Sequence, residues 1–470
     1  MAISYSVIFL VLLEGVAIYC AYRAVMSART PQGSVAWVLF LLLAPYIGII
    51  AYMFLGHHRM NGYVIVRRKT QRVVEGMENA RRENPPTGDA SALGYAGFET
   101  QAASPVLSGN AMELLIDGDE TFDAMFEAIR QATSYVLVQF YIVRDDGLGR
   151  AMQDELVRAA KRGISVRFLY DSVGSSRLSK QYIEVLKDAG VEILDSNALR
   201  GPTSRLQANF RNHRKTLIVD GKIGFTGGHN LGDEYLGKDL KMGHWRDTHC
   251  QLRGPIVRQL QLIFAEDWFW ATEHSLLDDL DWPKDLAPEN MDGVMLASGP
   301  ADELETGSLY YCSAIRAAKR RVWIATPYFV PDSDITTSLK IAAMSGIDVR
   351  ILIPDNVDHW ATYLAAFDYF DDLRKAGVQF WRYEKGFMHQ KVLLVDDTIA
   401  SVGTFNMDAR SCRLNFEATA IIFNKRAAKE VETMFKADFA QSYLLETPLA
   451  EQPLWIRLGA PVMRLFQPLL

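Results

Sequence analysis

An internal repeat constrains the fold of this chain more than any other feature of its sequence. An Ala-Ile-Arg triplet precedes a short apolar run at 135–141, and the same triplet precedes another at 322–328. Further along, an Ala-Ala-x-x-Gly-Ile segment opens the stretches 159–171 and 342–355, and an Ala-Gly-Val triplet follows in both copies. The same order of helix, strand, helix, strand, helix and strand is therefore predicted twice.

The strands of both copies are short and apolar throughout, which is typical of strands in a parallel sheet that is covered on both faces. Glycines close the intervening helices. The sequence therefore predicts the α/β class, with two similar domains at 105–275 and 290–447. Two copies of one fold favour a pseudo-twofold arrangement, in which equivalent loops can meet in one cleft.

Two apolar stretches, Ile3–Tyr22 and Val35–Leu55, precede the repeat. Each is close to the ~20 residues that a helix needs to cross about 30 Å of hydrocarbon, and Pro31 marks a turn between them. The sequence therefore predicts a transmembrane helical hairpin in residues 1–58. A cleaved signal peptide is the alternative for the first stretch, but that stretch lacks a basic leader and Glu14 interrupts its apolar run.

Basic residues near the spans predict the orientation of the hairpin. Two arginines lie between the spans, Arg23 and Arg29, and a richer group follows the second span: Arg59, Arg67, Arg68, Lys69, Arg72, Arg81 and Arg82. The richer side, with the repeat, is expected in the cytoplasm. The group could also attract anionic lipid headgroups or act only as a stop-transfer signal. Residues 59–104 are interpreted as a basic juxtamembrane segment and a linker, because 84–104 are rich in Pro, Gly, Ala and Ser.

A His-x-Lys-x-x-x-x-Asp motif occurs at the same point of each copy. The chain contains only nine histidines, so this duplication is a specific signal. The candidate catalytic residues are His213, Lys215 and Asp220 in the first copy and His389, Lys391 and Asp396 in the second. On a strand, residues two apart point to one face, so each histidine projects together with its lysine. The aspartates have the opposite parity, and a structural role at the strand end is predicted for them.

Two imidazoles and two ammonium groups are suited to phosphodiester chemistry. The lysines would balance the charge of the phosphodiester and of its transition state. One imidazole can attack phosphorus and form a phosphohistidine, while the other protonates the leaving oxygen and then deprotonates the incoming hydroxyl. The sequence shows no residues at metal-ligand spacing, so no metal or other cofactor is predicted. The four scattered cysteines are expected as small buried residues, without disulfides.

Small-residue turns follow both motifs and are candidates for phosphate contacts. They contain Gly228 and Asn230 in the first copy and Thr404 and Asn406 in the second. Small residues would let backbone N–H groups approach a phosphate, and the amides could donate to its oxygens; a plain turn is the alternative. Asp247 and Glu417 are candidates for the carboxylates that orient the imidazoles, with a surface or capping carboxylate as the alternative.

The paired motif resembles that of the phospholipase D superfamily, and the chain as a whole is similar to the bacterial cardiolipin synthases within it. The strings that carry this second resemblance are Ala36-Trp37 and the Pro45-x-x-Gly48-x-x-x-Tyr52-x-x-x-Gly56 pattern in the hairpin, Asn230-Leu-Gly-Asp-Glu-Tyr235, Asn406-Met-Asp408-x-Arg410-Ser411 and Asn415-Phe-Glu417. The resemblance implies that one phosphatidylglycerol passes its phosphatidyl group to a histidine, releasing glycerol. A second phosphatidylglycerol then attacks to give cardiolipin. It also implies His213 as the nucleophile, although the repeat leaves the two histidines interchangeable, and a multi-pass location in the bacterial inner membrane.

Other acceptors leave other functions open. Water would make the chain a phospholipase D-type hydrolase, and another alcohol would make it a different headgroup transferase. The hairpin and the formal net charge of −6 argue against a nuclease or other nucleic-acid partner. A lipid-binding scaffold without catalytic activity is the alternative that is not an enzyme, but both His/Lys pairs are intact. The amphipathic segment 448–470 could lie on the bilayer surface or pack on the core.

Overall fold

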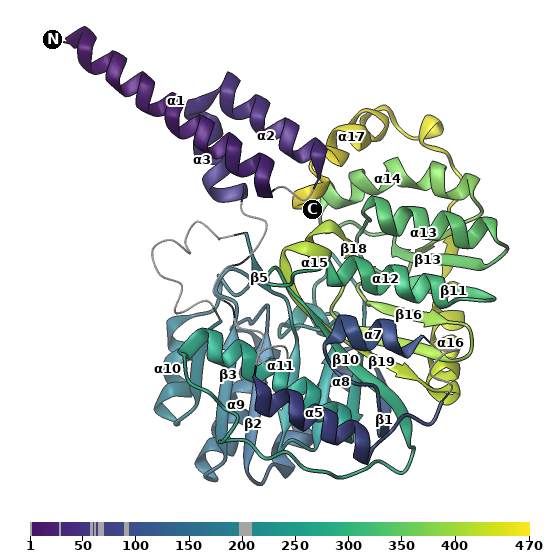
Figure 1. Ribbon diagram of the computed structural model, residues 1–470. Helices are drawn as coiled ribbons and strands as arrows, with labels where there is room; N and C mark the ends of the chain where they lie inside the picture. Colours follow the sequence, from purple (N-terminus) through teal and green to yellow (C-terminus); the bar gives the residue numbers. More distant parts are fainter. Residues whose placement is uncertain are drawn as a thin grey trace. The chain divides into compact units, whose positions relative to one another are not determined.

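The computed structural model describes residues 2–27, 30–56, 60, 63, 70–88, 94–196 and 209–470. The chain forms two compact units: Met1–Tyr63 with Leu199–Arg211, and Val64–Ala198 with Asn212–Leu470. The larger unit contains both copies of the repeat (Figure 1).

The first copy forms one half of a large sheet with its covering helices. Its elements are β1 (Leu107–Ile116), α8 (Asp117–Gln131), β2 (Tyr135–Phe140), α9 (Gly147–Lys161), β3 (Ser165–Tyr170), α10 (Lys180–Asp188), β4 (Glu192–Asp195), β5 (Arg211–Asn212), β6 (Thr216–Val219), β7 (Ile223–Gly227), the 3-10 helix η2 (Asp233–Leu236), β8 (Trp245–Arg246), β9 (Thr248–Arg253) and α11 (Pro255–Thr272).

The second copy repeats this order and adds a C-terminal helix. Its elements are β10 (Met291–Ser298), α12 (Thr306–Ala317), β11 (Arg321–Ala325), β12 (Phe329–Val330), α13 (Ser333–Met344), β13 (Asp348–Pro354), α14 (Trp360–Lys375), β14 (Gln379–Tyr383), β15 (Phe387–Met388), β16 (Val392–Val395), β17 (Ile399–Gly403), β18 (Met407–Asp408), α15 (Ala409–Arg413), β19 (Asn415–Phe423), α16 (Lys425–Phe439), β20 (Ser442–Leu444) and α17 (Leu454–Arg464), with 3-10 helices η3 (Leu449–Glu451) and η4 (Gln467–Leu469).

Both halves use the same strand order, and they join where β1 pairs with β10 in antiparallel fashion. The strands expected to be parallel, β2, β3 and β4 and their counterparts β11, β13 and β14, are parallel in the sheet. The strands that follow the motif residues, β6 and β16, run antiparallel to β2 and β11. An apolar run shows that a strand is buried on both faces, but it does not show the direction of its neighbour.

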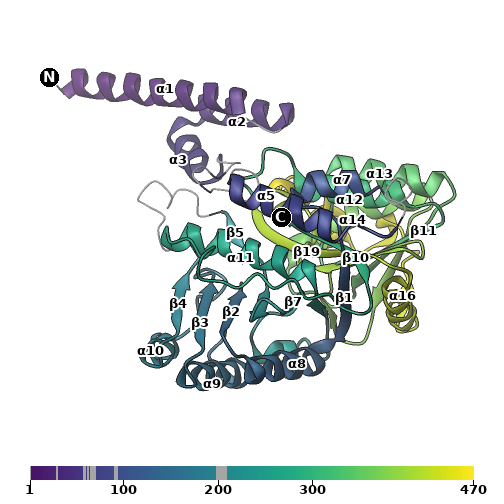
Figure 2. The same ribbon diagram turned by 60° about the horizontal axis from the view of Figure 1, so that its bottom comes forward.

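Three apolar clusters cover the sheet. Helices α8, α9 and α10 pack on one face of the first half, with Val136 and Val138 of β2 pointing toward them. Leu137, between these two valines, points to the opposite cluster, which contains α11, α16 and strands of both halves. Helices α12, α13 and α14 cover the second half (Figure 2). The shared central cluster makes the two halves one packed body.

The expected linker 84–104 is partly wrong. Residues 95–102 form the helix α7 (Tyr95–Ala102), whose Tyr95 and Phe98 are each 1% exposed and pack on Phe423. The apolar residues of this single short helix were too few to stand out against the Pro, Gly, Ala and Ser around them. Before it, α5 (Gln71–Glu83) is also helical.

The basic group after the apolar helices is described only in part. Arg72, Arg81 and Arg82 lie on α5 and form ion pairs with Asp278, Glu99 and Glu78. These three arginines therefore already have acidic partners, which weakens their expected role toward lipid headgroups. Arg29, Arg59, Arg67, Arg68 and Lys69 lie outside the described residues.

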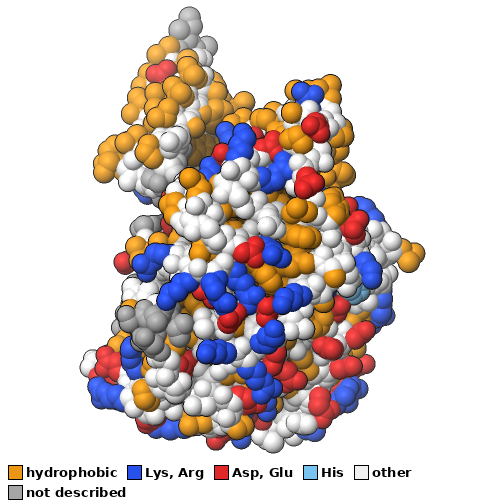
Figure 3. Space-filling view, turned by 90° about the vertical axis from the view of Figure 1, so that its right-hand side faces the viewer, with side chains coloured by type: hydrophobic (Ala, Val, Ile, Leu, Met, Phe, Trp, Pro, Cys, Tyr) orange, Lys and Arg blue, Asp and Glu red, His pale blue; other side chains and the backbone are white. Residues whose placement is uncertain are grey.

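The described residues of the smaller unit form the apolar helices α1 (Ala2–Ser27), α2 (Pro31–Leu43) and α3 (Pro45–Leu55). Ala17, Ala21 and Ala24 of α1 bury one stripe against Leu41, because small side chains let helices approach closely. Most other apolar side chains of α1–α3 are exposed, and Figure 3 shows this surface as hydrophobic almost throughout.

The second expected span, Val35–Leu55, is corrected by a break at Ala44. This residue has φ −138° and ψ 62° and ends α2, because Pro45 disfavours a helical residue before it and cannot donate a backbone hydrogen bond. Within the described residues, only α1 is long and apolar enough to cross a membrane, over Tyr5–Ser27.

The C-terminal segment packs on the core through one side of a helix. In α17, Ile456 and Ala460 are buried in the core of the second half, where the helix packs on α14. Six other apolar side chains of α17 and the residues after it are exposed: Leu454, Trp455, Leu458, Val462, Leu465 and Phe466.

Candidate active site

The aspartates of the two motifs lie at hairpin turns. Asp220 and Asp396 have positive φ angles of 52° and 51°, where β6 turns into β7 and β16 into β17. Asp220 accepts hydrogen bonds from the backbone N–H groups of Thr133, Ser134 and Tyr135 at 2.8–2.9 Å. Burial raises the pKa of Asp220, but these hydrogen bonds outweigh burial and hold it below its ordinary value.

Asp396 makes the equivalent contacts in the second half. It accepts from the backbone N–H groups of Lys319, Arg320 and Arg321 at 2.9 Å. Each aspartate thus attaches its hairpin to the start of the neighbouring strand, β2 or β11. In both halves this contact fixes the position of the strand that follows the motif histidine and lysine.

The motif histidines are each paired with a carboxylate of the other half. His213 Nδ1 lies 2.9 Å from Glu417 Oε2, and His389 Nδ1 lies 2.8 Å from Asp247 Oδ2. Backbone hydrogen bonds between the halves position these pairs. The His213 N–H donates to the carbonyl of Phe416, and the His389 N–H donates to the carbonyl of Arg246. The sequence singled out both carboxylates, but it did not indicate that the pairs would cross between the halves.

The two motifs share one buried site. Burial, together with the charges of Lys215 and Lys391, lowers the pKa of His213 to about 4, although the charge of Glu417 opposes this effect. Burial, Lys391 and Lys215 hold the pKa of His389 well below its ordinary value. Each histidine therefore senses the lysines of both halves. Both pKa values lie below 7, so both imidazoles are neutral at that pH. At His213 the Nδ1–H faces Glu417 as donor, so Nε2 carries the lone pair. Nδ1 of His389 lies 2.8 Å from Asp247 Oδ2 and also 2.9 Å from Lys391 Nζ.

Each motif lysine donates a hydrogen bond to the backbone of the histidine in its own motif. Lys215 Nζ donates to the carbonyl oxygen of His213 at 2.8 Å, and Lys391 Nζ donates to that of His389. Burial lowers the pKa of Lys391 to about 8, although the carboxylates of Asp247 and Glu417 oppose this effect. Burial also lowers the pKa of Lys215 well below its ordinary value. An arriving phosphate would favour the charged form of both lysines.

Two tyrosines next to the histidines were missed by sequence reasoning. The rings of Tyr141 and His213 have centroids 5.0 Å apart, and Lys215 Nζ lies 5.5 Å from the Tyr141 ring. The ring centroids of Tyr328 and His389 lie 6.4 Å apart. Both tyrosines follow the same strand of the repeat, β2 or β11, so an alignment of the two copies contained the signal.

The small-residue turns do not have the geometry that was expected of them. The backbone N–H groups of Gly228 and Thr404 donate to the carbonyls of Thr248 and Ala418, so neither points at a phosphate. Gly228 instead makes room for a carboxylate, since a Cβ there would lie 1.9 Å from Asp247 Oδ1. The hydroxyl of Thr404 donates to Glu417.

The two asparagines of these turns differ from each other. Asn230 donates through Nδ2 to the Tyr235 hydroxyl at 2.8 Å and accepts from the Ile142 N–H at 3.1 Å. Its amide is therefore already used within the protein. Asn406 is 5% exposed, and its Oδ1 has no hydrogen-bond partner among the described residues. Asn406 is the better placed of the two for a further contact.

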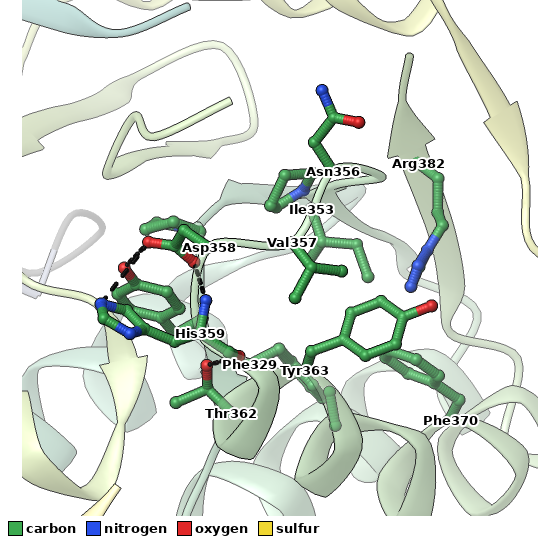
Figure 4. A pocket seen from close by; sticks show the side chains of 14 residues that line it. Phe329, Ile353, Asn356, Val357, Asp358, His359, Thr362, Tyr363, Phe370 and Arg382 are labelled. Carbon is green, nitrogen blue, oxygen red and sulfur yellow. Dashed lines mark hydrogen bonds and ion pairs between the residues drawn. The ribbon is translucent and has the colours of Figure 1, made fainter. Parts of the chain in front are cut away.

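A side pocket beside His389 breaks the symmetry of the repeat. This small cavity of about 30 Å³ is lined by Asp358 and His359 at one end and by Arg382 at the other (Figure 4), and Tyr328 also lines it. The Tyr328 hydroxyl donates to Asp358, and its ring lies 5.7 Å from that of His359. The first copy has Ser172-Val173-Gly174-Ser175 after the corresponding strand, so only the second half supplies these titratable groups.

Known proteins match the chain over nearly its whole length. The family described as "Cardiolipin synthase, PLD-like domain" matches residues 125–268 and 311–439, and "Phospholipase D-nuclease N-terminal" matches 15–57. Cardiolipin synthase A of Pseudomonas fluorescens (strain SBW25) is 43% identical over 98% of this chain and 98% of its own. Cardiolipin synthase A of Pseudomonas aeruginosa (strain LESB58) is 42% identical over 99% and 96%.

A solved structure supports the same fold. The phosphatidylserine synthase of Haemophilus influenzae superposes with a TM-score of 0.59 at 14% identity, covering 80% of this chain and 99% of that protein. The duplicated sheet, the paired motifs in one site and the full-length relatives agree: this chain belongs to the cardiolipin synthase family with PLD-like domains.

Proposed function

We propose that this protein transfers the phosphatidyl group of one phosphatidylglycerol to a second, giving cardiolipin and glycerol. Membership of the family makes it a phospholipid phosphatidyltransferase, and the names of the relatives point to cardiolipin as the product. The observation that carries the proposal is the pair of neutral histidines, each oriented by a buried carboxylate and both within the influence of two lysines.

In the first step, Nε2 of His213 attacks phosphorus and forms a P–N bond while the P–O bond to the headgroup glycerol breaks. His389, protonated in the complex, donates its proton to the leaving oxygen. A bound phosphodiester offsets the lysine charges that depress the pKa of His389, which makes this protonation accessible. The assignment of attack to His213 follows the family resemblance.

In the second step, the headgroup hydroxyl of another phosphatidylglycerol gives its proton to His389 and attacks phosphorus. The P–N bond breaks, His213 regains its lone pair, and cardiolipin leaves. Lys215 and Lys391 balance the charge on the phosphoryl oxygens in both steps. Asp247 and Glu417 are positioning residues for the imidazoles, and Asp220 and Asp396 hold the hairpins.

We also propose that the smaller unit anchors the enzyme in the cytoplasmic membrane with the catalytic body in the cytoplasm. The length and exposed apolar surface of α1 support insertion. The exposed apolar face of α17 supports contact of the body with the bilayer surface, and its Trp455 stacks edge-on against exposed Trp360 beside the side pocket.

The test uses the purified full chain in mixed micelles, with headgroup-labelled phosphatidylglycerol as the only lipid. Glycerol, cardiolipin and phosphatidic acid are measured together for the wild type, His213→Ala and His389→Ala. His274→Ala, which changes a surface histidine paired with Asp279, is the matched control. Equal amounts of glycerol and cardiolipin, lost in both motif variants and kept in the control, are expected. Phosphatidic acid with little cardiolipin would identify a hydrolase and contradict the proposal.

A further inference from the structure

A second, much larger cavity lies away from the motif residues. It is partly open to solvent, has a volume of about 460 Å³ and is lined by α5, α11 and the segments around Leu107 and Trp282. We call it the α5 cavity. None of the six motif residues lines it, so the chemistry described above does not account for it. Its size is within the range of cavities that hold small ligands.

The lining of the α5 cavity combines an apolar wall with positive charge. Leu107, Leu262, Leu277 and Trp282 contribute to the wall, with Met77 from α5. The lining also includes four cations and a single carboxylate: Arg72, Arg82, Arg258, Lys284 and Glu83. Arg72, Arg82 and Lys284 each pair with a carboxylate, Asp278, Glu78 and Glu83 respectively, so the excess positive charge of the lining lies on Arg258. An apolar wall beside excess positive charge is complementary to an anionic amphiphile.

Arg258 is the cation of this cavity whose hydrogen bonds are incomplete. Lys284 lies 2.6 Å from Glu83, and Arg72 lies 2.6 Å from Asp278. Nη2 of Arg258, in contrast, is buried and has no hydrogen-bond partner among the described residues. Leaving a buried guanidinium N–H unsatisfied costs free energy, whereas a phosphate oxygen is a strong acceptor for it. Burial also lowers the pKa of Arg258, although the negative charge of Glu83 opposes this effect.

The position of α5 in the sequence favours a lipid as the occupant. Helix α5 begins at Gln71, 15 residues after the last apolar helix ends near Gly56. We propose that the α5 cavity binds one anionic phospholipid, with its phosphate on Arg258 and an acyl chain along Leu262, Leu277 and Trp282. This site is separate from the catalytic centre, and only its access to lipid relies on the proposed membrane attachment.

The test measures lipid binding directly and does not use turnover. Full-length protein in nonionic detergent is titrated with phosphatidylglycerol that carries brominated acyl chains, and quenching of tryptophan fluorescence is recorded. A saturable quenching component is expected that is lost in Trp282→Phe. Arg258→Gln should weaken it at least about tenfold, because a charge-assisted hydrogen bond is removed. Arg253→Gln, which changes an exposed arginine near Glu289 outside the cavity, should leave it unchanged.

Additional variants and ligands distinguish a loss of lipid binding from unfolding and from a loss of catalysis. Leu262→Trp fills the cavity without changing its charge and should also remove the component, with melting temperatures recorded for every variant. Brominated phosphatidylcholine should bind at least tenfold more weakly, and inorganic phosphate should not displace the lipid. Equal binding by wild type and Arg258→Gln, or full displacement by phosphate, would overturn the proposal. If the protein forms no cardiolipin but still shows the saturable quenching of tryptophan fluorescence, only the proposed function is contradicted.

Discussion

The crossed pairing of histidines and carboxylates makes a sharp prediction for Glu417→Gln. Glu417 is fully buried, and its Oε2 lies 2.9 Å from His213 Nδ1. Glutamine has nearly the same shape and keeps an oxygen for the imidazole N–H, but it lacks the negative charge. His213 becomes positively charged during the reaction, whether as the phosphorylated nucleophile or as the acid. The substitution therefore weakens an interaction that is strongest in the transition state.

The expected magnitude follows from the hydrogen bond. A hydrogen bond to a charged group contributes about 1–1.5 kcal/mol more than one to a neutral group, which corresponds to a loss of roughly 5- to 13-fold in rate. Initial rates of cardiolipin formation in mixed micelles measure it. Glu432→Gln is the matched control. This carboxylate lies on α16 of the same half and pairs with Arg321 of β11 and Lys429 of α16, not with a motif histidine. A loss below threefold for Glu417→Gln in a folded protein would refute the reasoning.

Three further predictions concern the turns and the lysines. Asp220→Asn keeps the positive-φ turn but replaces an acceptor of backbone N–H groups, so the free energy of unfolding should fall by about 1–3 kcal/mol in urea titrations; an unchanged midpoint would contradict the structural role. Gly228→Ala places a Cβ 1.9 Å from Asp247 Oδ1 and should reduce activity more than tenfold, whereas Gly97→Ala, with no atom within 4 Å, should be neutral in the same assay. Because the pKa of Lys391 is lowered to about 8, its charged form is lost as pH rises through that value. The ratio kcat/KM should therefore fall above about pH 8, and this fall should move to higher pH in Lys391→Arg; an identical profile would argue against Lys391 as its origin.

The sequence predicted the body of the protein well because its signals are local and duplicated. The two α/β copies and the twin motifs repeat residue by residue, so each copy supported the reading of the other. The direction of β6 and β16 could not be predicted, because a strand that is buried on both faces has the same apolar pattern in either orientation. Helix α7 was missed because Tyr95 and Phe98 form too short a periodic signal within a Gly- and Ala-rich segment.

The site was predicted in its parts but not in its connections. Asp247 and Glu417 were identified as candidates from their chemistry, but the pairing depends on contacts between β8 and β15 and on the His213 N–H to Phe416 bond, which join distant segments. The function of Gly228 was misread for the same reason. A glycine that admits a side chain from elsewhere in the fold looks, in the sequence, like one that admits a ligand.

The crossed pairing of His213 with Glu417 and of His389 with Asp247 determines the smallest part of the architecture that can hold a complete site. A single copy on its own would contain a histidine without its carboxylate and a carboxylate without its histidine. The smallest catalytic unit of this architecture is therefore two copies in contact, whether one chain carries both or two chains each supply one. Under the proposed mechanism, damage to either copy would disable the chemistry of the other, so duplication here provides mutual dependence and no spare active site.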